Sequence, residues 1–428
     1  MRSIEPSSVS SQRELNWAGN YAYVGQVVRP DSVEALQELM SRSRRVRFLG
    51  TRHSFNAIGD SDLVIDMRGL PEFVDVDLHR GCVVVSGNST YGTLAPYLEA
   101  QGAALENLAS LPHISVAGSI STGTHGSGVG HGGLATAVRA LDIVRADGEL
   151  VTVARGDPDF AGCVVSLGAL GAIVRVTLEI VPTYEVRQSV TTHVPLPFVI
   201  EDLRAVMSAG YSVSLFTMWN GEVSQAWVKD RQDQITIPNT ALSAGEPATR
   251  QLHPLGDLDP VNCTPQLGLP GPWYDRLPHF RLGYTPSAGE ELQSEFLVDW
   301  ADAESALREL QSLEPATWSS LLISEIRAVA SDDLWLSPAF GRESLAIHFT
   351  WRKDIAAVST ALRSVEAALA PLKARPHWGK VFNGSVHRAA ELYPRLQDFT
   401  TLRERFDPRD TFRNDWLDLN VLGDKQAR

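Results

Sequence analysis

Two segments of the chain place a histidine among glycine and small hydroxyl residues, a combination that can bind phosphate. In the first, the apolar run Val46-Arg47-Phe48-Leu49 leads directly into Gly50-Thr51-Arg52-His53-Ser54-Phe55-Asn56. A strand that ends in such residues exposes several backbone N–H groups in one direction, and this nest binds phosphate oxygens, to which Arg52 could add positive charge. The neutral imidazole of His53 could act as a nucleophile or as a metal ligand. Taken alone, the segment is more often a turn with a surface histidine.

The second segment is a long loop, Ala109-Ser110-Leu111-Pro112-His113-Ile114-Ser115-Val116-Ala117-Gly118-Ser119-Ile120-Ser121-Thr122-Gly123-Thr124-His125-Gly126-Ser127-Gly128. A loop of this length is usually functional or disordered, and the apolar residues spaced along it argue against disorder. Its small residues would let the backbone approach a bulky ligand closely, while its hydroxyl and amide groups would supply hydrogen bonds. We therefore predict a ligand-binding loop, with a plain structural loop as the alternative.

Two further patterns suggest sites that their context does not support. Gly128-Val129-Gly130-His131-Gly132-Gly133 matches the dinucleotide pattern G-x-G-x-x-G, with Asp147 near the position of its ribose-binding acid. That motif must lie between a buried strand and a helix, whereas here it follows a glycine-rich loop and precedes a hairpin, so no nicotinamide site is expected. His113, His125 and His131 have no cysteine or carboxylate at ligand spacing, so we predict no metal site.

The helices and strands that must position these segments are expected to form an α+β unit in two lobes over residues 1–185. From Val27 to Gly69 the chain is typical of strand, helix and strand, with Asp31 or Ser32 as the helix cap. Residues 138–144 and 150–153 flank Asp147-Gly148, which indicates a hairpin, and residues 171–180 form a further strand.

The composition changes in the second part of the chain. Strands such as 345–351 alternate with helices such as 355–369, and a stretch rich in proline, glycine and asparagine covers 237–272. This pattern predicts a second domain over residues 186–379, a sheet covered by helices, followed by a C-terminal segment, 380–428, with a helix near 394–404.

The bulk composition excludes several classes of protein. The net charge of −13 repels polyanions, so nucleic acid is not expected as a partner. The three cysteines, Cys82, Cys163 and Cys263, lie far apart, which fits a reducing compartment. The first 16 residues lack the apolar core of a signal peptide, and no stretch approaches the ~20 apolar residues of a membrane span. We expect a cytoplasmic monomer that binds no membrane.

Together, the two glycine-rich segments resemble the FAD-binding domain of the vanillyl-alcohol oxidase superfamily. The shared features are a short strand that runs into Gly-x-x-His-Ser and, farther along, the run from Ala117 to Gly126. The usual Gly-Gly-Gly-His of that superfamily is Gly-Thr-Arg-His here, which we take as a variant of one branch.

Later segments narrow the resemblance to the alditol oxidase branch. Arg375-Pro376-His377-Trp378-Gly379-Lys380 resembles a motif shared by aldonolactone oxidases and alditol oxidases. Ser324-Glu325-Ile326-Arg327 and Ala346-Ile347-His348-Phe349-Thr350 resemble the substrate walls of alditol oxidases. The similarity extends from Asn16-Trp17-Ala18-Gly19-Asn20 to Phe412.

This resemblance implies FAD as the cofactor, joined covalently through its 8α-methyl group to His53. It implies FAD contacts from Gly50, Thr51, Arg52, His53, Ser54, Phe55, Asn56, Ala109, Ser110, Ser115, Gly118, Thr122, Gly123, Thr124, His125 and His377, with Ile173 and Val174 bordering the adenine. Ala109 lies where this superfamily controls the approach of oxygen to the flavin, and an alanine there should leave a path open. The implied fold is a two-lobed FAD domain, 1–185 with 380–428, around the substrate domain.

Oxidation of an alcohol requires the loss of a hydride from carbon and of a proton from the hydroxyl group, so positive charge or a base must be near. Lys380 and Arg327 can supply the charge, and a lysine beside an arginine should have a lowered pKa. Glu325, two residues before Arg327, points to the same face if this segment is a strand. It could orient the arginine and bind a substrate hydroxyl.

His348 and Thr350, also two residues apart, would form a second wall, and Ser110 and Gln293 would complete the set that binds hydroxyl groups. Without the resemblance, an ordinary ion pair and a core histidine would be the better interpretations of Glu325–Arg327 and His348. Many hydrogen-bonding groups without a large basic pocket fit a neutral, linear polyol such as xylitol or sorbitol and reject its deoxy analogues.

We therefore expect an oxidase of the alditol oxidase family, which converts a polyol and O2 to an aldose and H2O2. Two alternatives remain. An aldonolactone oxidase or dehydrogenase would share His377-Trp378-Gly379-Lys380 but take a cyclic lactone. A flavin-binding protein without turnover would need no such charged walls.

Overall fold

The structure is a computed structural model that describes residues 13–234, 239–256, 258–283, 290–384 and 386–423 of the 428-residue chain. Most of the N-terminal segment that argued against a signal peptide, residues 1–12, lies outside the described residues. Residues 424–428, at the end of the predicted C-terminal segment, also lie outside the described residues. So do residues 237, 238 and 257, which belong to the stretch rich in proline and glycine.

The first small sheet is parallel and carries the first glycine-rich segment. Its strands β1 (Gln26–Val28), β3 (Leu63–Asp66) and β2 (Val46–Leu49) pair in the order β1-β3-β2. Helix α1 (Val33–Arg42) connects β1 to β2, and the Ser32 hydroxyl caps it by accepting a hydrogen bond of 3.2 Å from the Ala35 N–H. Leu36 and Met40 bury the apolar side of α1.

The second small sheet is antiparallel, in the order β4-β5-β9-β7-β8. Its strands are β4 (Val74–Asp77), β5 (Cys82–Ser86), β9 (Ala172–Glu179), β7 (Val138–Val144) and β8 (Leu150–Ala154). Helices α2 (Tyr91–Ala100), α3 (Val116–Ser121) and α4 (Phe160–Val164) share one core with it, and β6 (Ala103–Ala104) pairs with β10 (Val181–Pro182). The predicted hairpin is β7 and β8, so the G-x-G-x-x-G match has no strand–helix context.

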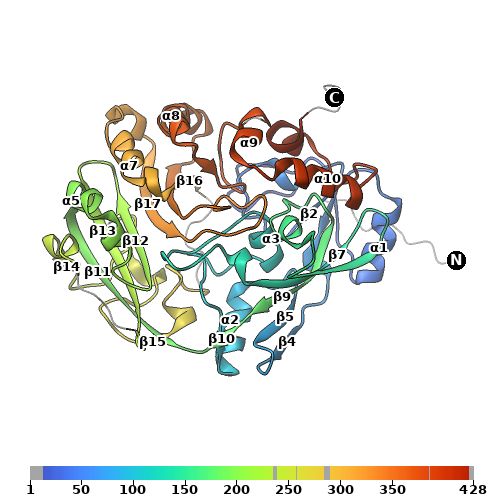
Figure 1. Ribbon diagram of the computed structural model, residues 1–428, viewed down its shortest axis with the longest axis horizontal. Coiled ribbons are helices and arrows are strands. Elements are labelled where there is room, and N and C mark those ends of the chain that lie inside the picture. Colours follow the sequence, from blue (N-terminus) through green and yellow to red (C-terminus); the bar gives the residue numbers. More distant parts are fainter. Residues whose placement is uncertain (1–12, 235–238, 257, 284–289, 385, 424–428) are drawn as a thin grey trace.

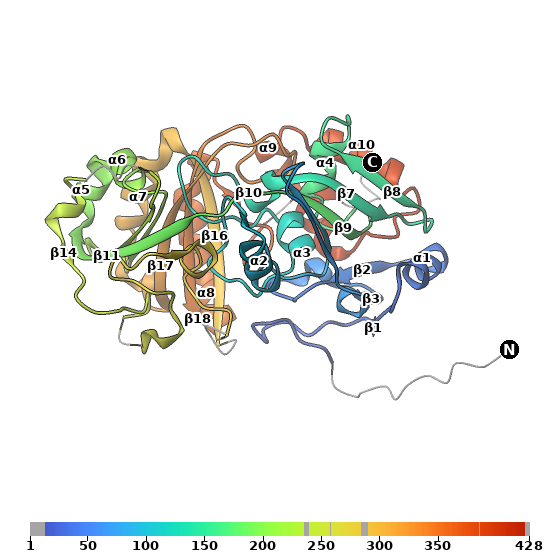
Figure 2. The ribbon, with the colours of Figure 1, turned by 90° about the horizontal axis from the view of Figure 1, so that it is seen from below.

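A large sheet, nine-stranded within the described residues, forms the other half of the molecule (Figures 1 and 2). Its order is β14 (Glu246–Pro247), β11 (Glu185–Pro195), β13 (Glu222–Arg231), β12 (Ser212–Thr217), β17 (Leu321–Val329), β18 (Ser344–Arg352), β16 (Glu291–Asp299) and β19 (Arg375–Pro376), with β15 (Gly271–Pro272) paired to β11. Neighbouring strands in this order are antiparallel, so each residue on one strand lies opposite a defined residue on the next.

Helices cover one face of this sheet: α5 (Leu196–Glu201), α6 (Leu203–Met207), α7 (Ala303–Gln311) and α8 (Ile355–Leu369). Because side chains alternate along a strand, Leu292, Ile326 and Phe349 pack against these helices while their neighbours point to the opposite face. This alternation gives the sheet an apolar side and a side on which polar residues gather.

One described helical stretch, Ile355–Leu372, is long and apolar enough to cross a membrane by length and mean hydropathy, contrary to the expectation that no stretch approaches a membrane span. In the structure it consists of α8 and a short 3-10 turn. Val358, Leu362 and Val365 on its apolar side are buried against the large sheet.

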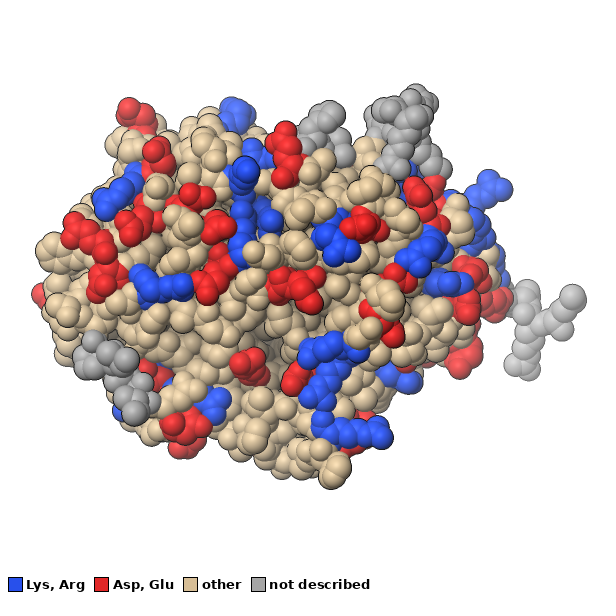
Figure 3. All heavy atoms as spheres, viewed as in Figure 1, with Lys and Arg blue, Asp and Glu red and all other residues tan. Residues whose placement is uncertain are grey.

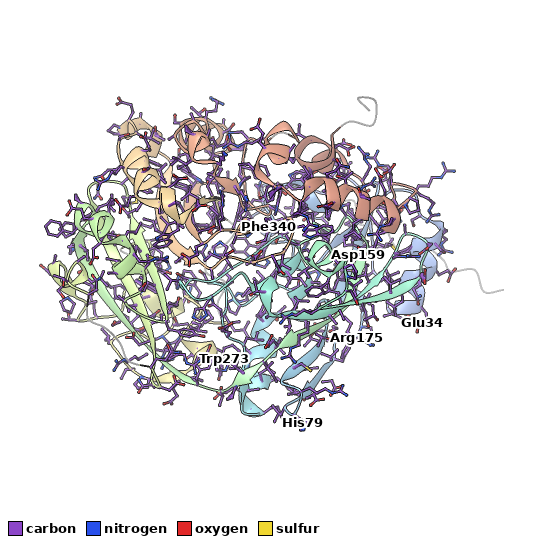
Figure 4. All side chains as sticks on the ribbon, in the orientation of Figure 1. Glu34, His79, Asp159, Arg175, Trp273 and Phe340 are labelled. Carbon is purple, nitrogen blue, oxygen red and sulfur yellow. The ribbon has the colours of Figure 1, made fainter. Side chains whose placement is uncertain are left out.

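The opposite face of the large sheet is partly covered by a segment that we call the strap, residues 248–256 and 258–283, which also contributes β15 to the sheet edge. It packs on β11, β12 and β13 through a small core that contains Phe216, Trp227 and Cys263. The Gln225 side chain on β13 donates to the His253 carbonyl of the strap at 2.8 Å. Farther along the strap, Trp273 is fully buried in the core of the N-terminal half (Figure 4).

The C-terminal segment returns to the N-terminal half. Helices α9 (Val386–Leu392) and α10 (Leu396–Phe406) lie over it in Figure 1, and α11 (Asp415–Leu417) follows them in the chain. Asp159, labelled in Figure 4, accepts a hydrogen bond of 2.6 Å from Arg405, and the Val46 N–H of β2 donates to the Thr411 carbonyl at 2.8 Å. The predicted α+β fold class is confirmed, whereas the boundaries at 185 and 379 stay a prediction.

Candidate active site

A cavity of about 290 Å³ lies where the two glycine-rich segments face the large sheet, and it collects most of the predicted site residues. The predicted residues that line it are Gly50, Thr51, Arg52, His53, Ser54, Phe55, Ala109, Ser110, Ser115, Gly118, Thr122, Thr124, His125, Ile173, Gln293, Glu325, Arg327, His348, Thr350, His377 and Lys380. These residues are far apart in the sequence, so the fold brings together what spacing alone could not.

Three predicted residues do not line the cavity. The Asn56 amide donates to the carbonyls of Trp378 (2.9 Å) and Lys380 (2.8 Å), so it holds the loop that carries Lys380. Gly123 has a φ of +73°, and a Cβ there would lie 2.8 Å from the Pro338 ring, so it shapes the loop. Val174 is buried in the core beside α1.

The two glycine-rich segments contact each other directly. The Thr51 hydroxyl accepts a hydrogen bond of 3.1 Å from the Ser115 N–H, and a Cβ on Gly50 would lie only 2.3 Å from the Ser115 hydroxyl oxygen. Glycine at position 50 is therefore needed for this close approach. Within the described residues we find no acceptor for the backbone N–H groups of Arg52, His53 and Ser54, so three consecutive donors remain for a ligand.

Arg52, which we expected to add positive charge to a phosphate site, has partners within the protein. Its guanidinium pairs with Glu14 and donates to the Leu15 carbonyl at 3.1 Å, and its role toward a phosphate stays a prediction. The residue itself has a φ of +63°, a left-handed conformation that few side chains favour, and this turns the loop between Thr51 and His53.

His53 is held by an aromatic neighbour that precedes it in the chain. Its ring stacks on Trp17 with centroids 5.1 Å apart and planes inclined by 22°, and its Nδ1 lies 3.0 Å from the Thr51 hydroxyl. Burial, followed by His113 and Lys380, lowers the pKa of His53 to about 3. The imidazole is therefore neutral at pH 7, the form that can act as a nucleophile.

The segment that carries Trp17 is fastened to the His53 turn on both sides. Asn16 donates to the Ser54 carbonyl and Asn20 to the Phe55 carbonyl, each at 2.9 Å, and the Trp17 N–H donates to the Arg52 carbonyl at 2.9 Å. The segment Asn16–Asn20, noted in the sequence only as part of a resemblance, is thus a clamp on the turn.

The wall opposite His53 is a row of side chains across the large sheet. In the register of its strands, Glu295 on β16 lies opposite His348 on β18, His348 opposite Glu325 on β17, and Glu325 opposite Phe216 on β12. Since alternate residues share a face, Arg327 and the other polar residues of these strands project into the same cavity.

Arg327 is at the centre of the charges in this wall. It pairs with Glu295, its Nε lies 3.6 Å from Glu325, and it donates to the Ser110 hydroxyl at 3.4 Å. Burial alone would raise the pKa of Glu295, but Arg327 and then His125, at 3.3 Å, hold that pKa well below its ordinary value. Burial would likewise raise the pKa of Glu325, but Arg327 and His279 lower it. The carboxylates of Glu295 and Glu325 are therefore both ionised.

Lys380 enters the cavity from the C-terminal motif. Its ammonium donates to the Gln293 side-chain oxygen and lies 5.1 Å from the centre of the Phe55 ring. Burial lowers the pKa of Lys380 to about 8, an effect that Arg327 increases and Glu295 opposes. His348, 3.3 Å from the same Gln293 oxygen, has its pKa lowered to about 3 by burial and then by Lys380.

Sequence reasoning missed three charged or titratable groups around this wall. Glu295, two residues after Gln293, could have been found by the alternation that predicted Glu325 and Arg327. The sequence around the other two residues does not indicate a site. His279, which is hydrogen-bonded to Glu325, reaches the wall because it lies on the long strap. Lys229 lies beside His279 because the strand register of β13 places it there.

Comparison with known proteins identifies the family. A family model for an FAD binding domain matches residues 24–154, and one for D-arabinono-1,4-lactone oxidase matches residues 290–420. An alditol oxidase from Streptomyces sp. (strain IKD472 / FERM P-14339) is 45% identical over 408 residues, 94% of this chain and 97% of that protein. The chain belongs to the alditol oxidase branch of the vanillyl-alcohol oxidase family.

Other relatives are more distant from this alditol oxidase family member. The L-gulono-1,4-lactone dehydrogenase of Mycobacterium tuberculosis is 28% identical over 95% of this chain and 98% of that protein. The L-gulonolactone oxidase of Bos taurus is 27% identical over 94% and 97%. A crystal structure of cholesterol oxidase from B. sterolicum is 12% identical with a TM-score of 0.75 over 96% of both chains, which shows the same fold.

The residues of this family member that line the cavity fit two parts of FAD, the pyrophosphate and the adenine. Three free amide donors at Arg52–Ser54 fit a pyrophosphate group. Asn88, which lines the cavity with Ile173, has a buried Oδ1 without a partner in the described residues, so an acceptor remains for a polar ring. Ala109 is buried and also lines the cavity, and its role in admitting oxygen stays a prediction.

The described residues contain no group of three or more histidines, cysteines or acids that could hold a metal ion. The three histidines that raised the question have other neighbours: His113 contacts the Leu282 carbonyl at 2.7 Å, His125 the Gly126 carbonyl at 2.8 Å, and His131 the Glu106 carboxylate at 3.3 Å.

Proposed function

We propose that this protein is an alditol oxidase that carries FAD covalently on His53. It oxidises the terminal hydroxyl of a linear polyol such as xylitol or sorbitol to the aldose and reduces O2 to H2O2. The observation that carries this proposal is the charged row on the large sheet, with Arg327 and Lys380 beside it, facing the His53 turn across one cavity.

Bound FAD would take up the hydride that leaves the alcohol carbon and pass both electrons to oxygen. The protein must then handle the hydroxyl proton and the charge that develops on oxygen. Arg327 remains a cation at any working pH and stabilises an alkoxide. Lys380, with a pKa of about 8, is close to the ideal for a base that accepts the hydroxyl proton as a neutral amine.

The remaining wall supplies hydrogen bonds for a chain of hydroxyl groups. Glu325 is an ionised acceptor, and Ser110 and Thr350 can donate and accept. Gln293 is oriented from both sides, because Lys380 donates to its oxygen and its nitrogen donates to Glu291 at 2.5 Å. A polyol can pair with such a set, whereas a substrate without the hydroxyls would leave buried polar groups unmatched.

An aldonolactone oxidase or dehydrogenase is the second candidate, because the family model over residues 290–420 is described by that activity. The higher identity to an alditol oxidase, 45% against 28% for the lactone dehydrogenase, favours the polyol. Peroxide release should be measured with xylitol, sorbitol, L-gulono-1,4-lactone and L-galactono-1,4-lactone. We expect turnover with the alditols, and turnover with the lactones alone would overturn the proposal.

The covalent link has its own test. Wild-type protein should keep its yellow colour in the pellet after acid precipitation and washing, whereas His53→Ala protein should release all its FAD. Complete release from the wild type would show that the link is absent without affecting the proposed reaction.

Arg327→Ala should slow anaerobic flavin reduction by xylitol by about 100-fold or more, since one stabilising donor is lost.

A further inference from the structure

A lysine that has no part in the proposed reaction is buried close to the active-site wall. Lys229 on β13 is only 1% exposed, and a lysine this deep is rare unless its charge is paired. Its ammonium contacts three acceptors: the Leu277 carbonyl, the Pro278 carbonyl at 3.3 Å and Nδ1 of His279 at 3.1 Å. The hydrogens of the amine can make all three contacts, although burial lowers the pKa of Lys229 to about 7.

The contacts with Glu325 and Lys229 fix which nitrogen of His279 carries the proton. Nε2 lies 2.7 Å from Oε1 of Glu325, an ionised carboxylate that can only accept, so Nε2 carries the hydrogen and donates it. Nδ1 of the neutral ring then accepts from the Lys229 amine. The His279 ring has little freedom to move, because it packs against Trp227 (5.1 Å between centroids) and Phe216 (5.7 Å).

The backbone of His279 is fixed as well. Its N–H donates to the Ser110 carbonyl at 3.1 Å, and its carbonyl accepts from the Thr264 N–H at 2.9 Å. The first of these bonds joins the strap to the glycine-rich loop, so His279 is placed relative to both walls of the cavity.

The two oxygens of Glu325 are consequently in different situations. Oε1 accepts from His279 and lies 3.6 Å from Arg327 Nε. For Oε2 we find no hydrogen-bond partner in the part of the chain that the structure describes, and Glu325 lines the cavity. A carboxylate anchored through one oxygen presents the other to a ligand in a fixed direction.

We propose that Lys229 and His279 form a positioning pair that holds Glu325 with Oε2 directed at a substrate hydroxyl beyond the reacting carbon. This inference rests on the proposed function and extends it to specificity. Neither residue touches the reacting atoms. The pair selects substrates that bear a hydroxyl at that point and excludes those that lack it, since a fixed carboxylate left unpaired is costly.

The test compares xylitol with pentan-1-ol, which has the same chain length but lacks the four hydroxyl groups beyond the reacting carbon. In His279→Leu and Lys229→Met the ratio of kcat/KM for xylitol to that for pentan-1-ol should fall by about ten-fold or more, corresponding to about 1.4 kcal/mol. His279→Gln should retain most of the ratio, because its amide nitrogen can donate to Glu325. Equal losses for both substrates, or no advantage of Gln over Leu, would overturn the proposal.

A second measurement does not depend on any substrate. In protein labelled with ¹⁵N-histidine, the signals that disappear in His279→Gln identify His279 in the wild type. They should show a neutral ring protonated at Nε2, and Lys229→Met should shift the Nδ1 signal. A ring protonated at Nδ1 would refute the pair even if the wild type oxidised xylitol. The expected tautomer in a protein that oxidises no alditol would instead refute the proposed function alone.

Discussion

At the scale of single residues, Lys380 is the group whose titration should be visible in the reaction. Burial lowers its pKa to about 8, and only the neutral amine can accept the hydroxyl proton. We expect kcat/KM for xylitol to rise with pH and to level off above about 8. In Lys380→Met this limb should disappear and activity should fall by about 100-fold or more, in line with the loss of a catalytic base. The exposed Lys373→Met is the matched control, and an unchanged pH profile in Lys380→Met would exclude the lysine as the base.

His53 and Trp17 give a second prediction at this scale. The stacked indole restrains the ring that we propose to carry FAD, so Trp17→Leu should lower the fraction of flavin that stays with the denatured chain, and Trp17→Phe should restore most of it. The fraction can be measured as absorbance of the washed acid pellet against total flavin. Val24→Ala, at an exposed position nearby, serves as the control. Equal covalent flavin in Trp17→Leu and the wild type would show that the stacking is not required.

At the scale of elements, α8 supports the wall from behind. Its buried residues pack on the face of the large sheet opposite the charged row, so they stabilise the strands that carry Glu325 and His348. Leu362 is fully buried, and Leu362→Ala should reduce the free energy of unfolding by about 2–5 kcal/mol. Ile355 at the start of the same helix is 57% exposed, and Ile355→Ala should change the free energy of unfolding by less than about 0.5 kcal/mol. Denaturant unfolding of the two variants measures both free energies. Similar decreases in Leu362→Ala and Ile355→Ala would contradict the role of the buried side of α8.

At the scale of the whole molecule, the cavity makes stability depend on pH. Burial lowers the pKa of His279 to about 4 and of His348 and His377 to about 3, whereas an unfolded histidine titrates near 6.5. Between these values the unfolded chain binds protons that the folded chain does not, so stability is lost as pH falls below about 6.5, by up to about 1.4 kcal/mol per pH unit for each histidine. The lowered pKa values of Glu295 and Glu325 act in the same direction below about 4.3.

The melting temperature should therefore fall between pH 7.5 and pH 5.5 at constant ionic strength. His348→Gln should show a smaller decrease over this interval, since one of the titrating groups is gone. His193→Gln is the control, because His193 is exposed at the surface. A melting temperature that stays constant or rises on acidification would mean that the cavity histidines are already protonated in the folded protein. On the face of the molecule seen in Figure 3, acidic and basic groups are interspersed, so no single patch of one sign on that face should dominate this dependence.

The sequence by itself was sufficient for features that depend on local order. The hairpin at Asp147-Gly148 and the helix capped by Ser32 follow from turn chemistry and periodicity, and both are present. The alternation of Glu325 and Arg327 predicted a common face and could have predicted Glu295 as well. The resemblance then joined the two glycine-rich segments into one site.

Only the tertiary structure decided what reaches the site from a distance. Arg52 pairs with Glu14, because its left-handed backbone conformation and the N-terminal segment set its direction. His279 reaches Glu325 by way of the strap, and Lys229 reaches His279 through the pairing of β13 in the sheet. Neither contact leaves a periodic signal in the sequence, because burial and ion pairing depend on packing between segments rather than on spacing along the chain.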